Sequence, residues 1–162
     1  GEPVVLLDAT DISFLHQLNV VATETLKSVG MNVQVQAMDF SMLTSRRSKK
    51  EAPGAGGWNA FLTSWVSADV LNPVGTAYLN AGCDKALFGW PCDEQMEKLR
   101  DAFARETDTG KQKAIAEQVQ LRLLEYPTHV PVGQWKKPAV LRANIDGNVI
   151  APVTVFWNVT KK

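Results

Sequence analysis

The feature that most restricts the fold lies in residues 3–37, where three hydrophobic patterns follow one another with short connections. Residues 3–7 form a continuous apolar run that contains two valines, which is typical of a buried strand. Residues 12–29 carry apolar side chains at helical spacing, and Gly30 follows where a helix commonly ends in a left-handed residue. Residues 33–37 alternate between apolar and polar side chains, as a half-buried strand does. This order predicts a βαβ unit with two parallel strands and a right-handed crossover.

Capping and turn residues divide the rest of the chain into further helices and strands. The expected helix N-caps are Thr10 or Asp11, Asp39 or Ser41, Asp93, and Asp108 or Thr109. Residues 58–65 are expected to form a third strand, Pro127 to end the last long helix, and Asp146-Gly147 to form a hairpin turn. The alternation predicts the α/β class, with a small, mostly parallel sheet flanked by helices.

One shared core is expected from the inner faces of these elements, because 162 residues suffice for one compact domain and 45% of them are apolar. The residues expected to be buried together are Leu15, Leu18, Ala22, Leu26, Val33, Val35, Phe61, Leu99, Phe103, Ile115 and Val119.

The charges exclude several kinds of partner. Seventeen basic and seventeen acidic side chains give a net charge of zero, which argues against a nucleic-acid surface or a polybasic membrane patch. The short basic cluster at residues 46–50 is interpreted as a solvated helix end. No apolar run approaches the roughly 18–20 residues of a membrane span. The sequence starts without a signal-peptide pattern and its first apolar run begins almost at once, so we interpret the chain as a fragment of a longer protein.

Catalytic and metal-binding patterns are not found. The sequence has no phosphate-binding glycine loop, no nucleophile elbow and no run of metal ligands. His16 and His129 are isolated histidines, and helix capping explains Asp8 and Asp11 better than acid–base chemistry does. We therefore expect a binding protein and no enzyme, with no metal and no cofactor. A small α/β hydrolase is the weaker alternative, because no nucleophile stands at a suitable spacing from a base.

The strongest binding signal is the change of pattern at Trp65. This residue ends the expected third strand, and a polar, irregular stretch with Asp69 and Asn72-Pro73 follows it. Ligands of open α/β sheets bind beyond the carboxyl ends of the strands. An indole ring, a carboxylate and an amide at that place predict that Trp65, Asp69 and Asn72 line a ligand site, although core packing of Trp65 is an alternative.

The two cysteines, Cys83 and Cys92, flank a loop that contains Gly89 and Pro91. Two cysteines without a histidine at ligand spacing do not make a zinc site. A disulfide that closes this short loop is the preferred interpretation, and a pair of inert buried thiols is the alternative.

The order of these landmarks resembles the family-5 extracellular solute-binding proteins, which serve dipeptide, oligopeptide, nickel and glutathione importers. The second lobe of that family typically has a strand ending in Trp, then an Asp after two residues, an Asp-Pro and an aromatic-rich helix. Trp65, Asp69, Asn72-Pro73 and Tyr78 stand at the corresponding positions, and the resemblance spans essentially the whole chain. The gap between Trp and Asp is one residue longer here, and Asn72 replaces the second acid.

The resemblance implies the function and the organisation of the chain. Residues 1–132 correspond to the second lobe of a hinged clamshell, and residues 133–162 to a return segment that completes a first lobe. The implied function is capture of a peptide or peptide-like ligand outside the cytoplasm, in the periplasm, and its delivery to an ABC permease. Asp69 resembles the anchor of a ligand's amino group. A peptide-binding regulatory or chaperone-like module is the alternative function.

Overall fold

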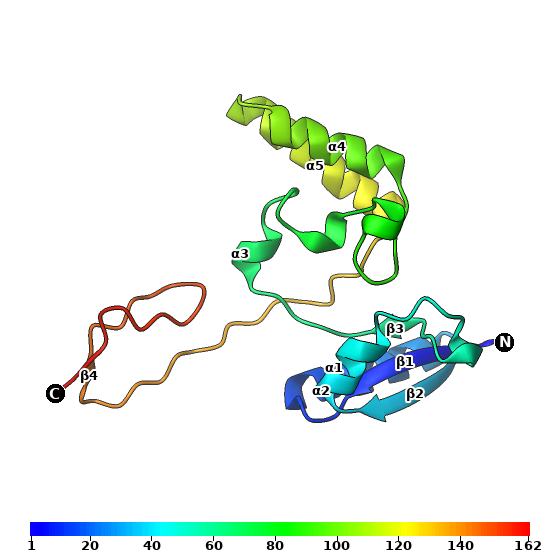
Figure 1. Ribbon diagram of the computed structural model, residues 1–162, viewed down its shortest axis with the longest axis horizontal. Helices are drawn as coiled ribbons and strands as arrows, with labels where there is room; N and C mark the ends of the chain where they lie inside the picture. The colour runs from blue at the N-terminus through cyan, green and yellow to red at the C-terminus, as the bar shows by residue number, and fades with distance from the viewer. The chain divides into compact units, whose positions relative to one another are not determined.

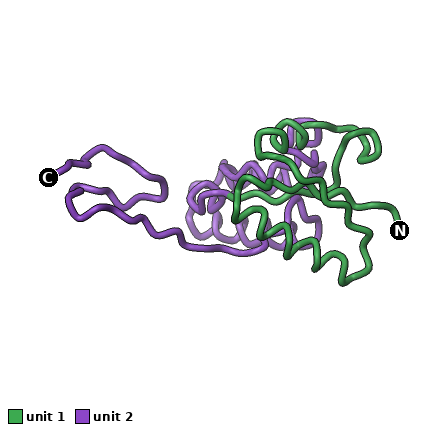
Figure 2. Tube along the Cα trace, turned by 90° about the horizontal axis from the view of Figure 1, so that it is seen from below, with its two compact units in different colours: residues 1–64 green, residues 65–162 purple.

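The computed structural model describes all 162 residues, which divide into two compact units (Figure 2). Unit 1 comprises Gly1–Ser64 and unit 2 comprises Trp65–Lys162. Each unit has a hydrophobic core of its own, so the single shared core expected from the sequence is wrong. Of the eleven residues expected to be buried, only Val35 is exposed, and the others are buried or partly buried in one unit or the other.

Unit 1 is a three-stranded parallel sheet with two helices (Figure 1). Its elements are β1 (Pro3–Ala9), α1 (Ser13–Ser28), β2 (Asn32–Met38), α2 (Phe40–Arg46), a 3-10 turn (Pro53–Ala55) and β3 (Ala60–Phe61). The strand order is β2-β1-β3, which confirms the predicted βαβ unit and the α/β class. The third strand is shorter than the predicted residues 58–65, because only Ala60 and Phe61 pair with β1.

The central position of β1 explains its continuous apolar sequence. A strand with parallel neighbours on both sides and helices over the sheet is buried along most of its length. Val5, Leu6 and Leu7 are accordingly buried, and Leu7 has no exposed surface. The core cluster of the unit consists of Val5, Leu7, Ala9, Leu15 and Leu43, with Ile12, Met38, Phe40, Trp58 and Phe61 packed against it.

Helix α1 presents a more polar face to the sheet than its apolar stripe predicts. Its buried residues are Leu15, Asn19 and Thr23, whereas Val29 is exposed. The Asn19 side chain donates a hydrogen bond of 2.8 Å to the carbonyl oxygen of Leu7, so an amide bonded to the backbone of β1 is buried at a position outside the predicted apolar stripe.

The ends of α1 agree only in part with the sequence expectations. The N-cap is Ile12, which has no side-chain capping bond, so the predicted cap by Thr10 or Asp11 is wrong. Asp11 instead accepts a hydrogen bond from the backbone N–H of Phe40, at 2.8 Å. Gly30 has a φ of 87°, and the Met31 N–H bonds to the Leu26 carbonyl, which confirms the predicted left-handed helix end.

The basic cluster at the end of α2 is solvated only in part: Lys49 and Lys50 are exposed as expected, whereas Arg46 and Arg47 are partly buried, which corrects the sequence interpretation for these two residues. Arg46 donates hydrogen bonds to Gln36, at 2.7 Å, and to the carbonyl of Gly57, at 3.0 Å. The guanidinium of Arg47 lies over the ring of Phe61. On the edge strand β2, Gln36 is therefore partly buried while Val35 is exposed, so the predicted alternation holds at residues 32–34 and is reversed at residues 35–37.

Asp8 and His16 form a partly buried pair beside the end of β1. One carboxylate oxygen of Asp8 lies 2.8 Å from His16 Nδ1, and the other is buried without a partner. Replacing His16 with alanine removes this partner from a buried carboxylate, so we expect a loss of about 1–2 kcal/mol in the free energy of unfolding. Urea denaturation measures the loss. Gln17→Ala on the exposed face of α1 is the control, and an equal effect of both changes would contradict the role of the pair.

Unit 2 is built around an antiparallel pair of helices. Its elements are α3 (Ser67–Val70), two 3-10 turns (Ala77–Leu79 and Cys83–Lys85), α4 (Glu94–Arg105), α5 (Thr109–Glu125), β4 (Ile145–Asp146) and β5 (Thr160–Lys161). The side chain of Asp93 accepts from the N–H of Gln95 and that of Asp108 from the N–H of Lys111, which confirms both predicted caps. Leu79, Ala81, Met96 and Val119 form the core, with Leu99 and Leu123 against it.

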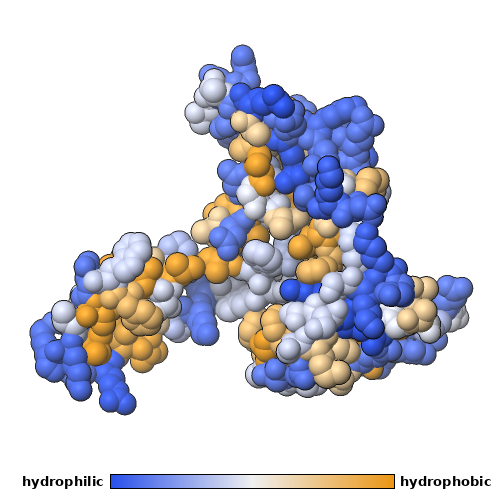
Figure 3. All heavy atoms as spheres, in the orientation of Figure 1, coloured by the Kyte–Doolittle hydropathy of each residue, from blue (hydrophilic) through white to orange (hydrophobic).

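Residues 133–162 are extended, and most of their side chains are exposed. Strand β4 pairs with β5 in antiparallel fashion, so Asp146-Gly147 begins a long loop instead of the predicted tight hairpin. Exposed apolar residues include Val140, Ile150, Phe156 and Trp157, and orange spheres gather over this segment in Figure 3. None of the helices of the chain combines the length and apolar character that crossing a membrane requires.

Candidate functional site

Trp65, the first residue of unit 2, is half exposed although it is large and apolar; 49% of its surface is accessible. Its indole N–H donates a hydrogen bond to the hydroxyl of Tyr78. The two rings meet edge to face, with centroids 5.3 Å apart and planes at 89°. This geometry is favourable for aromatic rings and fixes the orientation of the indole. One part of the Trp65 ring is thus held by Tyr78, and the remainder is exposed to solvent.

Tyr78 is itself held by the segment that follows α5. The ring of His129 lies 5.4 Å from that of Tyr78, and the hydroxyl of Thr128 donates a hydrogen bond to the Tyr78 carbonyl. Since the Thr128 hydroxyl has a single hydrogen, its oxygen accepts from Nδ1–H of His129, 3.1 Å away. Burial lowers the pKa of His129. We call Trp65, Tyr78 and His129 the aromatic trio; it joins three segments that are distant in sequence.

Asp69 lies in α3, the single helical turn that follows Trp65. The side chain is exposed, and its carboxylate makes no hydrogen bond or ion pair with the chain. A carboxylate that is free of internal partners is available to a cationic group of a ligand.

Asn72 has a structural task at the end of the same stretch. Its side-chain oxygen accepts hydrogen bonds from the N–H groups of Val74, at 2.8 Å, and Gly75, at 3.0 Å. Its carbonyl accepts from the N–H of Thr76. These bonds form an Asx turn, so the side-chain oxygen is occupied and only the NH₂ of the side-chain amide remains for a ligand. We call residues 65–72, for which the sequence predicts a ligand site, the binding stretch; Trp65, Asp69 and Asn72 are all exposed along it.

Cys83 and Cys92 form a disulfide, which confirms the preferred interpretation of the two cysteines. Both residues are exposed, and this excludes the alternative of inert buried thiols. The backbone closes the same loop, because the N–H of Cys83 bonds to the Pro91 carbonyl and the N–H of Asp93 to the Ala81 carbonyl. The loop therefore leads directly into the N-cap of α4.

Sequence reasoning missed the contact of Trp65 with Tyr78 and that of Tyr78 with His129. Tyr78 was noted only as part of an aromatic-rich helix, and His129 only as an isolated histidine. The nearest signal in the sequence is the polar pair Thr128-His129 directly after Pro127, where a helix ends. No group of three or more His, Cys, Asp or Glu side chains is arranged to hold a metal ion.

A hollow of about 310 Å³ lies elsewhere, beside α2 in unit 1. Its lining residues are Met38, Ser41, Met42, Ser45, Arg46 and Lys49. It contains none of the predicted site residues, and it is open to solvent.

Comparison with known proteins identifies relatives for nearly the whole chain. A probable peptide ABC transporter periplasmic-binding protein of Sinorhizobium fredii is 30% identical over 161 residues, which are 99% of this chain. The chain spans only 30% of that relative's length. No family model matches the chain.

A solved structure supports the fold. The oligopeptide-binding protein AppA of Bacillus subtilis, determined in complex with a nonapeptide, matches with a TM-score of 0.55 over 78% of this chain and 24% of its own. The sequence identity of 16% makes this a likeness of fold alone. The sequence match confirms the resemblance to extracellular solute-binding proteins that the order of sequence landmarks indicates, and the structural match confirms the fold.

Proposed function

We propose that this chain is the second lobe and return segment of an extracytoplasmic solute-binding protein, which captures a peptide or peptide-like ligand and delivers it to an ABC permease in the membrane. The observation that carries the proposal is the 30% identity over 99% of the chain to a probable peptide-binding component of such a transporter. The relatives are binding proteins and not enzymes, which supports a role without catalysis.

The proposed organisation keeps residues 1–132 as the lobe and residues 133–162 as the return into a first lobe. The exposed apolar side chains of the last thirty residues support it, because soluble proteins rarely leave many such groups uncovered. Ile150 and Val140 are the clearest cases, since nearly all of their surface is accessible. The first lobe would cover them, and a ligand would be enclosed when the two lobes close.

The binding stretch offers a ligand two kinds of contact. The half-exposed ring of Trp65 presents an apolar face, and Asp69 presents a carboxylate without an internal partner. We assign to Asp69 the amino group of a peptide or peptide-like ligand, which a charge-assisted hydrogen bond would hold with about 1.5–3 kcal/mol. Asn72 contributes to the stretch mainly by shaping its end.

The test is Trp65→Ala in the two-lobed protein. Synthetic peptides of two to nine residues are offered as a mixture, the bound species is identified by native mass spectrometry, and its Kd is measured by calorimetry. Loss of an aromatic anchor should weaken binding by about 1 kcal/mol or more, roughly fivefold or greater, with little change in the melting temperature.

The matched control is Leu121→Ala, which shortens an exposed apolar side chain on α5 and should leave the Kd unchanged. If Trp65→Ala unfolds the lobe and the folded fraction keeps its full affinity, Trp65 is a core residue and the site assignment fails. If no peptide binds to the unaltered two-lobed protein, the proposed function itself fails.

A further inference from the structure

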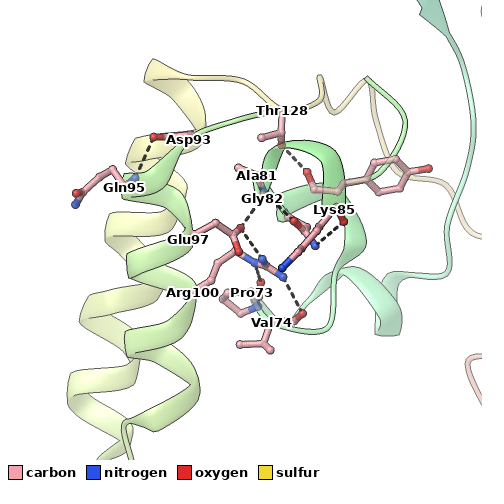
Figure 4. A network of polar contacts seen from close by, with 12 residues as sticks. Pro73, Val74, Ala81, Gly82, Lys85, Asp93, Gln95, Glu97, Arg100 and Thr128 are labelled. Carbon is pink, nitrogen blue, oxygen red and sulfur yellow. Dashed lines mark hydrogen bonds and ion pairs between the residues drawn. The ribbon is translucent and has the colours of Figure 1, made fainter. Parts of the chain in front are cut away.

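We propose that Arg100 is a positioning residue for the binding stretch, which it holds through the backbone carbonyls of Pro73 and Val74. This inference rests on the proposed function, since it assigns Arg100 a task in ligand binding. It begins from the guanidinium group of Arg100 on α4 (Figure 4).

The guanidinium uses its donors on three acceptors. Its Nε donates to the Pro73 carbonyl at 3.0 Å, and one terminal nitrogen, Nη2, donates to the Val74 carbonyl at 3.2 Å. The other terminal nitrogen, Nη1, donates to Glu97 at 2.7 Å. Only 12% of the Arg100 side chain is exposed, so these bonds are largely protected from competing water. Arg100 therefore fixes the backbone that follows the binding stretch. Because it bonds to main-chain carbonyls, this hold does not depend on the side chains of residues 73 and 74.

The same turn is held from its other side. Asn72 accepts from the N–H of Val74, while Arg100 donates to the carbonyl of Val74. Both polar groups of Val74 are thus bonded to side chains. At the opposite end of the stretch, Trp65 is bonded to Tyr78. Asp69 lies between these two attachments, and its side chain makes no hydrogen bond or ion pair, so the position of its carboxylate depends on both attachments.

Glu97 connects Arg100 to the backbone that leads into the disulfide loop. One of its carboxylate oxygens accepts both from Arg100, at 2.7 Å, and from the backbone N–H of Ala81, at 2.8 Å (Figure 4). A planar guanidinium reaches two carbonyls and a carboxylate at once, whereas a lysine ammonium is a compact point charge on a flexible chain. Arg100→Lys keeps the charge and loses this geometry, which makes it the informative substitution.

The experiment measures amide hydrogen exchange in this chain and the peptide Kd in the two-lobed protein. Arg100→Lys is expected to raise the exchange rates of the Val74 and Gly75 amides about tenfold and to leave the amides of α4 unchanged. The Kd for the peptide identified above should rise three- to tenfold. Arg105→Lys is the matched control, because Arg105 lies on the same helix and pairs only with the exposed Asp101.

Equal exchange in the two variants would overturn the positioning role. A uniform rise over α4 and residues 66–76 would also overturn it, since it would show that Arg100 only stabilises the fold. If Trp65→Ala weakens binding and Arg100→Lys does not, positioning is wrong while the proposed function stands. If Trp65→Ala has no effect, the site assignment fails, and the exchange rates still decide whether Arg100 holds the turn.

Discussion

Replacing Asp93 with alanine is expected to lower the free energy of unfolding of unit 2 by about 2–3 kcal/mol. Asp93 is only 7% exposed and performs two tasks at the start of α4. Its carboxylate caps the helix at the N–H of Gln95, 3.1 Å away. It also accepts two hydrogen bonds from Arg122 on α5, at 2.6 and 2.9 Å. Alanine removes the cap and also the ion pair that connects α4 to α5, while Arg122 keeps its hydrogen bond to Glu125.

Hydrogen exchange of the α4 and α5 amides during urea titration measures this loss within unit 2. Asp101→Ala is the matched control, since it removes an exposed carboxylate that pairs with Arg105 on the same helix. Exposed pairs of this kind contribute about 0–1 kcal/mol. If the two variants lose the same amount, the bond from Asp93 to Arg122 does not stabilise the pair of helices.

The same carboxylate predicts a pH dependence. The hydrogen bonds from Arg122, with further help from the Gln95 N–H, hold the pKa of Asp93 below its ordinary value. A group with a lowered pKa in the folded state stabilises the fold above its unfolded pKa of about 3.9 and loses this contribution as the pH falls through the folded value. Stability measured from pH 6 to pH 2 should therefore fall more steeply below about pH 4 in the unaltered chain than in Asp93→Asn.

Local signals made much of the fold predictable from sequence. The continuous apolar run of β1, the left-handed Gly30 and the caps at Asp93 and Asp108 each depend on residues within about five positions. Such features follow from backbone geometry and from the unsatisfied N–H groups of a helix end. They were accordingly predicted at the correct residues.

Features that depend on distant partners were not predictable in this way. Asn19 is buried because the carbonyl of Leu7 accepts its hydrogen bond, and Gln36 is partly buried because Arg46 donates to it. An apolar periodicity counts both positions as polar and assigns them to the surface. In each case a tertiary hydrogen bond outweighs the pattern, because a buried polar group is tolerated when it is bonded.

In the candidate site too, local features were predictable and contacts between distant residues were not. The change of pattern after Trp65 placed an exposed indole and an unpartnered Asp69 in one short stretch, as the structure has them. The contact of Tyr78 with Trp65 and that of His129 with Tyr78 were not predicted, because only folding brings these rings together from 13 and 51 positions apart in the numbering. Asn72 was expected to meet a ligand, yet the backbone of its own turn occupies its oxygen.

Loss of the disulfide between Cys83 and Cys92 is expected to destabilise unit 2 by roughly 2.5–3 kcal/mol. The bond closes a loop with a sequence separation of 9, and the chain-entropy cost of such a loop in the unfolded state sets this magnitude. The loop also contains Trp90, and the left-handed φ values of Cys83, at 56°, and Trp90, at 45°, are unfavourable for residues with a Cβ. The crosslink keeps this segment closed in front of Asp93, so its removal should also loosen the start of α4.

Hydrogen exchange of the α4 amides, with and without a thiol reductant, tests this expectation in the unaltered chain. The double variant Cys83→Ala, Cys92→Ala should match the reduced chain and should not respond to the reductant, which separates loss of the bond from other effects of the reagent. After reduction, the backbone hydrogen bonds from Cys83 to Pro91 and from Asp93 to Ala81 can still form. The loop should therefore still close in the folded state without the disulfide. Unchanged α4 exchange on reduction would show that these backbone bonds alone define the loop and that the disulfide adds nothing to the stability of unit 2.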